Sequence, residues 1–243
     1  GSHTITYNYT DAGGCSASNT ATIVVNALPV VDAGTYNALC VNATAITLAG
    51  TPAGGTFSGP GVTGNTFNPA TAGTGTHTLT YNYTDANGCS ASDNATIVVN
   101  ALPVVNAGTY APVCANAAVI TLAGTPAGGT FSGTGVTGNS FDPASGIAGP
   151  NTIIYTYTDP NGCTNAASTA ITVNALPVVD AGTYTATCVD GTAITLAGTP
   201  AGGTFSGPGV TGTTFNPATA GTGTHTLTYN YTDAGGCSAS DNT

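Results

Sequence analysis

Cysteine recurs along this chain at a fixed spacing of 74 residues. Two series share the spacing: Cys15, Cys89, Cys163 and Cys237, and then Cys40, Cys114 and Cys188. A fixed period in a sequence indicates one structural unit per repeat. The 243 residues therefore hold a little over three copies of one small unit. Residues 44–94 and 192–242 differ only at Asn65/Thr213 and Asn87/Gly235, so the copies are close.

The segment before each cysteine of the first series has the pattern of a β-hairpin. In residues 77–85 the side chains of Leu79, Tyr81 and Tyr83 alternate with threonine and asparagine. Alternation of aromatic or aliphatic residues with polar ones is typical of a half-buried strand. The Asn87-Gly88 pair that follows favours a tight turn, and residues 95–100 supply a second strand.

Short strands and turn signals also fill the rest of each unit. In the first whole copy they fall at residues 30–36, 45–49, 56–58 and 62–67, before the hairpin. About seven short strands with no helical periodicity predict an all-β fold of tandem immunoglobulin-like β-sandwiches. The expected core comprises Ile46, Leu48, Phe57, Phe67, Leu79, Tyr81, Ile97 and Val99, with the residues 74 and 148 positions later as far as residue 243.

The repeat boundaries follow from Leu-Pro pairs whose prolines are Pro29, Pro103 and Pro177. Proline fixes its own backbone angle, so these joints are expected to be stiff. Residues 1–27 are the carboxy-terminal hairpin of a truncated repeat, and residues 28–101 and 102–175 are whole repeats. Residues 176–243 form a repeat without its last strand, so either the parent chain continues or another chain supplies a strand, and continuation is favoured.

The composition excludes several functions. The chain has no Lys or Arg, and its formal net charge is −10. Without basic residues, electrostatic binding to nucleic acid or to an anionic membrane is excluded. No apolar run of 18 residues exists, so insertion into a membrane is not expected.

No catalytic constellation can be found, and the chain is not expected to be an enzyme. The candidate bases are His3, His77 and His225 and the aspartates, which occupy turns. A turn aspartate usually accepts hydrogen bonds from nearby backbone. Asp32 and Asp85 are weak calcium candidates, because a sandwich would place both at one end of the repeat. Asn106 replaces the first of them in the middle repeat, and no cofactor is expected.

Several short motifs together resemble a known kind of repeat. They are Val30-Val31-Asp32-Ala33-Gly34, Cys40, Ile46-Thr47-Leu48-Ala49-Gly50, Gly55-Thr56-Phe57-Ser58-Gly59, Thr78-Leu79-Thr80-Tyr81 and Thr84-Asp85-Ala86-Asn87-Gly88-Cys89. The whole chain is similar to the PKD-like, immunoglobulin-like repeats of large surface adhesins and type IX secretion cargo of Bacteroidota-type bacteria. The resemblance implies an extracellular spacer or adhesion module and carries no catalytic residues.

Three cysteine arrangements are open. Pairing within a repeat would join Cys40–Cys89, Cys114–Cys163 and Cys188–Cys237. In a seven-strand sandwich, however, the turn before the second strand and the turn of the hairpin lie at opposite ends, about 25 Å apart. A disulfide needs Cα atoms within roughly 7 Å. Inter-domain pairs Cys40–Cys163 and Cys114–Cys237 are therefore favoured over the first set, and free thiols are the third arrangement. Under this pairing Cys15, Cys89 and Cys188 would bond with units outside residues 1–243 or between chains.

The expected function is structural. Near-identical tandem repeats suit a part whose purpose scales with length, such as a stalk or a fibre, stiffened by disulfides and proline joints. The alternative is a glycan- or surface-binding adhesive module, which would need an exposed aromatic platform. Paired cysteines point to an extracellular location, on the cell surface or secreted. The expected partners are neighbouring repeats of the same long chain and identical chains in a filament.

Overall fold

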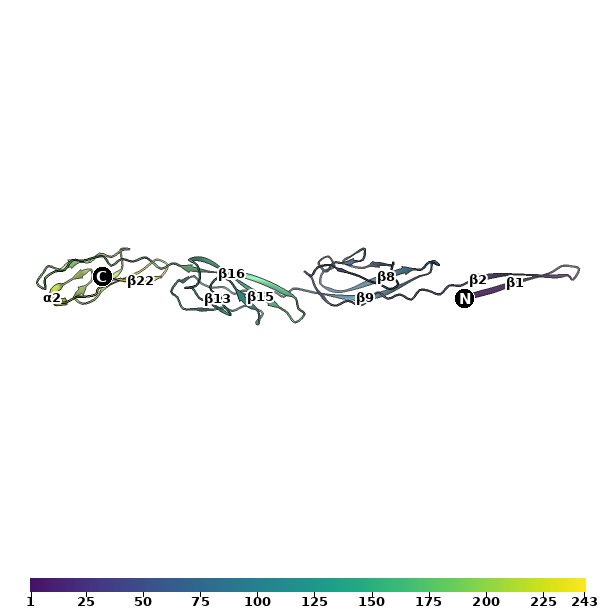
Figure 1. Ribbon diagram of the computed structural model, residues 1–243, viewed down its shortest axis with the longest axis horizontal. Coiled ribbons are helices and arrows are strands. Elements are labelled where there is room, and N and C mark those ends of the chain that lie inside the picture. Colours follow the sequence, from purple (N-terminus) through teal and green to yellow (C-terminus); the bar gives the residue numbers. More distant parts are fainter. The chain divides into compact units, whose positions relative to one another are not determined.

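The computed structural model describes all residues 1–243. The chain divides into two compact units, each described by itself below. The first comprises residues 1–103 together with 158–164, and the second comprises residues 104–157 together with 165–243. Almost all regular structure in both units is β-strand, as the alternating sequence pattern predicts (Figure 1).

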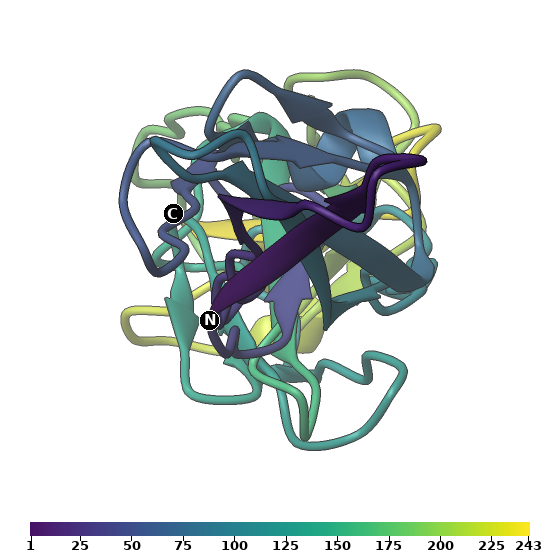
Figure 2. The ribbon, with the colours of Figure 1, turned by 90° about the vertical axis from the view of Figure 1, so that its right-hand side faces the viewer.

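The first unit begins with an isolated hairpin of β1 (Ser2–Thr10) and β2 (Ser16–Val24). The two strands pair in register from Ser2↔Val24 to Thr10↔Ser16 and form a two-stranded sheet. Figure 2 shows them as the dark purple arrows joined by a tight turn. No second sheet covers the hairpin, so every residue in it is exposed.

The first whole repeat is a seven-strand sandwich of two sheets. A four-stranded sheet has the order β3-β9-β8-β5, and a three-stranded sheet has the order β4-β7-β6. The element bounds are β3 (Leu39–Cys40), β4 (Ile46–Thr47), β5 (Thr56–Ser58), β6 (Val62–Thr63), β7 (Thr66–Phe67), α1 (Pro69–Ala72), β8 (Gly75–Thr84) and β9 (Ser90–Asn100). The predicted immunoglobulin-like all-β class is confirmed.

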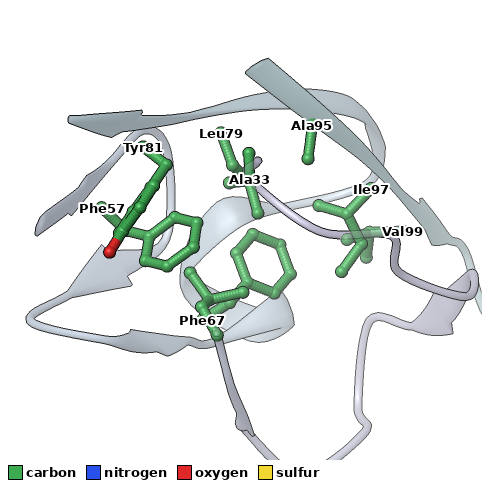
Figure 3. Close-up of a cluster of buried hydrophobic side chains, with 9 residues drawn as sticks. Ala33, Phe57, Phe67, Leu79, Tyr81, Ala95, Ile97 and Val99 are labelled. Carbon is green, nitrogen blue, oxygen red and sulfur yellow. The ribbon is translucent and has the colours of Figure 1, made fainter. Parts of the chain in front are cut away.

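The predicted core forms on the inward faces of these strands. Leu79 and Tyr81 of β8 and Ile97 and Val99 of β9 are at most 2 % exposed, and they meet Leu48, Phe57 and Phe67 (Figure 3). Ile46 is half-buried and packs against this cluster. Two small side chains that the sequence pattern did not indicate, Ala33 and Ala95, complete the core.

Tyr81 fixes the loop between β4 and β5. Its hydroxyl donates a hydrogen bond to the carbonyl of Pro52 and accepts one from the backbone N–H of Gly55, at 2.8 Å. A Cβ atom at Gly50 or Gly55 would lie within 2.6 Å of the ring, so both positions require glycine. The Thr51-Pro52 peptide bond is cis.

The second unit holds the third repeat and the second repeat without its hairpin turn of residues 158–164, and both repeats are built from the same parts as the first. The second repeat contains β10 (Val113–Cys114), β11 (Ile120–Thr121), β12 (Thr130–Ser132), β13 (Val136–Thr137), β14 (Ser140–Phe141), β15 (Gly149–Thr158) and β16 (Thr164–Asn174). The third contains β17 (Ile194–Thr195), β18 (Thr204–Ser206), β19 (Val210–Thr211), β20 (Thr214–Phe215), α2 (Pro217–Ala220), β21 (Thr228–Thr232) and β22 (Ser238–Asn242).

The structure corrects some local expectations. Residues 30–36 were expected to form a strand, but only the isolated bridge Asp32↔Thr51 is present. Residues 68–75 were expected to be loop, yet Pro69–Ala72 form a helical turn that Asn68 caps through its side-chain oxygen. Residues 176–243 contain no counterpart of β3. In the first repeat β3 pairs with Val99 and Asn100 at the end of β9, whereas β22 corresponds only to residues 90–94 of that strand.

We expect Tyr81→Phe to destabilise the first whole repeat. The change leaves the Gly55 N–H and the Pro52 carbonyl unpaired in a half-buried site, which costs about 1–3 kcal/mol. Hydrogen exchange of peptides from β5 and β8, followed by mass spectrometry, measures the loss of protection. Tyr83→Phe is the matched control, since Tyr83 is half-buried on the same strand without a hydroxyl bond to the protein. Equal effects of both changes would contradict this role for Tyr81.

Candidate functional site: the disulfide-bonded joints

A disulfide-bonded joint is the place where a cysteine of one repeat meets a cysteine of the next, and each joint has two halves. The first half is the turn of a long hairpin. In the turn between β15 and β16, Oδ1 of Asp159 accepts hydrogen bonds from the backbone N–H groups of Asn161 and Cys163, at 2.9 and 2.8 Å. Gly162 has a φ of 83°, a left-handed angle that favours glycine. The aspartate thereby fixes the backbone at Cys163, and Asp233 holds Cys237 in the same way, at 2.9 Å.

The second half of each joint lies at the opposite end of the preceding repeat. Cys40 ends β3, a two-residue strand that runs parallel to the end of β9, with Cys40 opposite Asn100. The N–H of Val41 donates to the carbonyl of Asn100 at 2.9 Å. Cys40 is therefore held beside the residue at which the chain leaves the repeat. Cys114 has the same place at the end of β10, opposite Asn174.

Two disulfides connect these halves. Cys40 is bonded to Cys163 and Cys114 to Cys237, both with Cα atoms 5.5 Å apart and a sequence separation of 123 residues. The pairs Cys40–Cys89, Cys114–Cys163 and Cys188–Cys237 within repeats are absent, because Cys163 and Cys237 bond across repeats instead. Each disulfide lies within one compact unit, since the turn of residues 158–164 belongs to the first unit.

The two hairpin cysteines that form disulfides are buried, and three other cysteines are free thiols. Cys163 and Cys237 are completely buried. At the second joint, a Cβ atom added to Gly235 would lie 3.4 Å from Nδ2 of Asn174, so the turn packs closely against the end of β16. Cys15 and Cys188 are exposed free thiols, and Cys89 is a half-buried one.

The predicted proline joints lie in irregular segments. Pro29, Pro103 and Pro177 follow the last strand of a hairpin in each case, and all three are half-buried. No regular element extends across these positions.

The two calcium candidates, Asp32 and Asp85, use a carboxylate oxygen to accept hydrogen bonds from backbone N–H groups of their own turns. Oδ1 of Asp32 accepts a hydrogen bond from Gly34 at 2.7 Å, and Oδ1 of Asp85 accepts from Asn87 and Cys89 at 2.9 and 2.8 Å. No three His, Cys, Asp or Glu side chains form a group suited to a metal ion in residues 1–243. These oxygens act as turn caps in the structure.

The histidines of the first and third repeats, His77 and His225, occupy a structural position near a loop. Nε2 of His77 lies 2.9 Å from the carbonyl of Gly73, and His225 lies 3.0 Å from that of Gly221. Asn151 replaces histidine in the second repeat, where its amide bonds Ile147 in both directions, at 2.8 and 2.9 Å. His3 lies in the exposed amino-terminal hairpin.

Two groups have shifted pKa values with local causes. Burial raises the pKa of Tyr36, and the negative charge of Asp32 adds to this, while a hydrogen bond from the Ala49 backbone opposes it. The hydroxyl of Ser145 and the N–H of Ala144 hold the pKa of Asp142 below its usual value.

Comparisons with known proteins find weak likeness. No protein-family model matches the chain, and no curated protein matches it. Among solved structures, a Ca²⁺-stabilized adhesin with which an Antarctic bacterium binds ice has 13 % identity and a TM-score of 0.39, covering 99 % of this chain and 80 % of that one. A Bacteroides ovatus mixed-linkage glucan utilization protein, SGBP-B, has 17 % identity and a TM-score of 0.23, covering 90 % of this chain and 68 % of that one.

No helix of the structure has the length and hydrophobicity that crossing a bilayer requires.

We expect a digest under non-reducing conditions to contain peptides that link Cys40 to Cys163 and Cys114 to Cys237. Trypsin has no cleavage site in a chain without Lys or Arg, so chymotrypsin or pepsin is required. Mass spectrometry before and after reduction identifies the pairs. A peptide that links Cys40 to Cys89 would contradict the observed strand topology, because these residues lie at opposite ends of one sandwich.

Proposed function

We propose that this chain is a load-bearing segment of a long extracellular fibre or adhesin stalk made of immunoglobulin-like repeats in series. The observation that carries the proposal is that a disulfide links each of the first two whole repeats to the repeat that follows. The polypeptide itself provides one connection between neighbours, and the disulfide provides a second. A catalytic or a purely globular domain has no evident use for this arrangement.

The two disulfides shorten the route along which force passes. Because the bonded intervals overlap, the shortest covalent route follows residues 1–40, 114–163 and 237–243 only. This route contains about 97 residues and extends to roughly 330 Å, whereas the reduced chain extends to roughly 830 Å. Unfolding of a repeat therefore cannot lengthen the oxidised chain beyond that smaller limit.

The remaining chemistry is consistent with an extracellular stalk. Disulfides persist mainly in oxidising compartments outside the cytosol. Without lysine, the chain cannot form the Lys-Asn or Lys-Asp isopeptide bonds that could otherwise reinforce it. Cysteine is thus the residue that supplies its covalent reinforcement.

The alternative of a glycan-binding module receives less support from the aromatic residues. Sugar recognition commonly uses exposed aromatic faces, yet every Tyr and Phe in residues 28–243 is buried or half-buried. The two exposed aromatic residues are Tyr7 and Tyr9, in the amino-terminal hairpin that has no covering sheet. A glycan array with the purified chain tests the alternative, and specific hits would favour an adhesive module.

We expect single-molecule pulling to give a final contour length of roughly 330 Å for the oxidised chain and roughly 830 Å after reduction. The double variant Cys114→Ser, Cys237→Ser retains one disulfide and leaves a route of about 121 residues, or roughly 410 Å. Force–extension curves of chains attached by both ends provide the measurement.

A matched control replaces the exposed free cysteines, Cys15→Ser and Cys188→Ser, which should leave the oxidised length unchanged. Equal lengths before and after reduction would contradict a load-bearing function for the disulfides. The same force–extension curves show whether the variants fold, because each folded repeat gives its own unfolding event even when no disulfide links it to its neighbours.

A further inference from the structure

The two cysteines of each joint differ in burial. The first joint is the disulfide of Cys40 with Cys163, and the second joint is that of Cys114 with Cys237. The hairpin cysteines, Cys163 and Cys237, are completely buried, whereas Cys40 and Cys114 are half-buried. The hairpin turn alone does not bury its cysteine, since Cys89 occupies the same position of its turn without a disulfide and is half-buried. The hairpin sulfur is therefore covered where the joint is closed.

A thiol cleaves a disulfide by a defined course. A thiolate attacks one sulfur, forms a mixed disulfide with it and expels the other sulfur as a thiolate. A second thiolate then releases the first sulfur, so two reagent thiols become one reagent disulfide and the two electrons reduce the protein disulfide. Because either sulfur can be attacked first, each joint offers two routes.

The first route, attack at the hairpin cysteine, is closed by packing. The backbone of Cys237 is held on both sides, since its N–H donates to Oδ1 of Asp233 at 2.9 Å and its carbonyl accepts from the N–H of Asp233 at 3.0 Å. A Cβ atom at Gly235 would lie 3.4 Å from Nδ2 of Asn174, so the turn packs against the end of the preceding repeat. A reagent thiolate cannot reach a residue with no exposed surface while the joint keeps this packing.

The second route, attack at the half-buried cysteine, has an unfavourable leaving group. It expels the hairpin sulfur as a thiolate inside a buried site. The N–H of Cys163 already donates to Oδ1 of Asp159, at 2.8 Å, and the group that receives it carries a negative charge. Reactive thiolates are stabilised by nearby cations or helix N-termini, and this chain has no Lys or Arg. A thiolate formed there leaves slowly, so this route is also disfavoured in the closed joint.

We propose that the closed joint shields its disulfide from thiol reductants, and that a thiol such as glutathione cleaves it only after the hairpin turn has moved away from the preceding repeat. Asp159 and Asp233 are positioning residues in this device, because they hold the turn in the conformation that buries the cysteine. An open turn exposes the hairpin sulfur and lets water solvate the leaving thiolate.

The consequence for a stalk rests on the load-bearing function proposed above. A pull that separates two repeats opens the joint between them, so the pull that loads a disulfide also exposes it to thiols. A relaxed series of repeats keeps its disulfides in the presence of a reductant, whereas a loaded series loses them and gains length. The joint is then a site where force decides whether a thiol reacts.

Reduction kinetics of the full 1–243 chain test the shielding without applied force. The free cysteines are first alkylated with iodoacetamide, so that they cannot exchange with the disulfides. The oxidised chain is then incubated with reduced glutathione, quenched with N-ethylmaleimide and digested with pepsin, and mass spectrometry gives the cleavage rate at each joint. Both rates should be at least about a hundredfold lower in the folded chain than in concentrated guanidinium chloride, because cleavage awaits a local opening.

Two variants assign the shielding to the individual turns. Asp159→Ala removes two hydrogen bonds to a charged group and should accelerate cleavage at the first joint about tenfold or more. The second joint of the same molecules should keep its rate, which also reports that the second repeat remains folded. Asp233→Ala should have the reverse effect. Asp85→Ala is the matched control, because it removes the same cap from a turn without a disulfide, and both rates should stay unchanged.

Three results would overturn the proposal. They are similar cleavage rates in the folded and the denatured chain, equal acceleration of both joints by Asp159→Ala, and acceleration by Asp85→Ala as large as that by Asp159→Ala. Because these rates are measured without load, they can fail while the contour lengths expected of a load-bearing chain still hold, and the contour lengths can fail while the shielding holds.

Discussion

Each sandwich depends on one strand face, the inward side chains of its last strand. In the first whole repeat, Ala95, Ile97 and Val99 of β9 close the core over Phe67 and Leu79. The short β3 also needs this strand, since it pairs with the end of β9 and with nothing else. Residues 176–243 include only the part of this strand that corresponds to residues 90–94; they have no counterpart of β3, and Phe215 is partly exposed.

The absence of basic residues decides which interactions remain available to hold this fold. No aspartate can pair with Lys or Arg, and several carboxylates accept hydrogen bonds from backbone N–H groups instead. Asp85, Asp159 and Asp233 cap the hairpin turns, and Oδ2 of Asp93 accepts from the N–H of Ala33, 60 residues away in sequence, at 2.9 Å. No buried side-chain nitrogen or oxygen lacks a hydrogen-bond partner. Apolar burial, backbone hydrogen bonds and disulfides thus provide the stability.

The sequence predicts the long elements well and the short ones poorly, for a physical reason. Period-two alternation over ten residues identifies the face of β8 that carries Leu79 and Tyr81, and both are buried. β3 has only two residues and α1 only four, so neither has a period that could be recognised. Ala33 is completely buried, but alanine is common on both sides of a sheet and gives no signal.

The site follows the same division. The pairing of Cys40 with Cys163 could be favoured from strand count alone, because the two turns of one sandwich must lie at opposite ends. The parallel ladder that holds Cys40 beside Asn100 could not be foreseen, since it depends on β3.

Strand pairing joins residues of the same repeat, whereas disulfide bonding joins residues of neighbouring repeats. The packing of each core and the covalent continuity of the series therefore depend on different bonds. The strands close a sandwich within one repeat, whereas each disulfide reaches from one repeat to the next. Because neither disulfide joins two strands of the same sandwich, reduction removes the second covalent link between neighbouring repeats and leaves each core's apolar contacts in place. Conversely, a force that opens one core leaves the covalent route through Cys40 and Cys163 intact. A series of such repeats can therefore lose and regain the packing of a single member without losing its continuity.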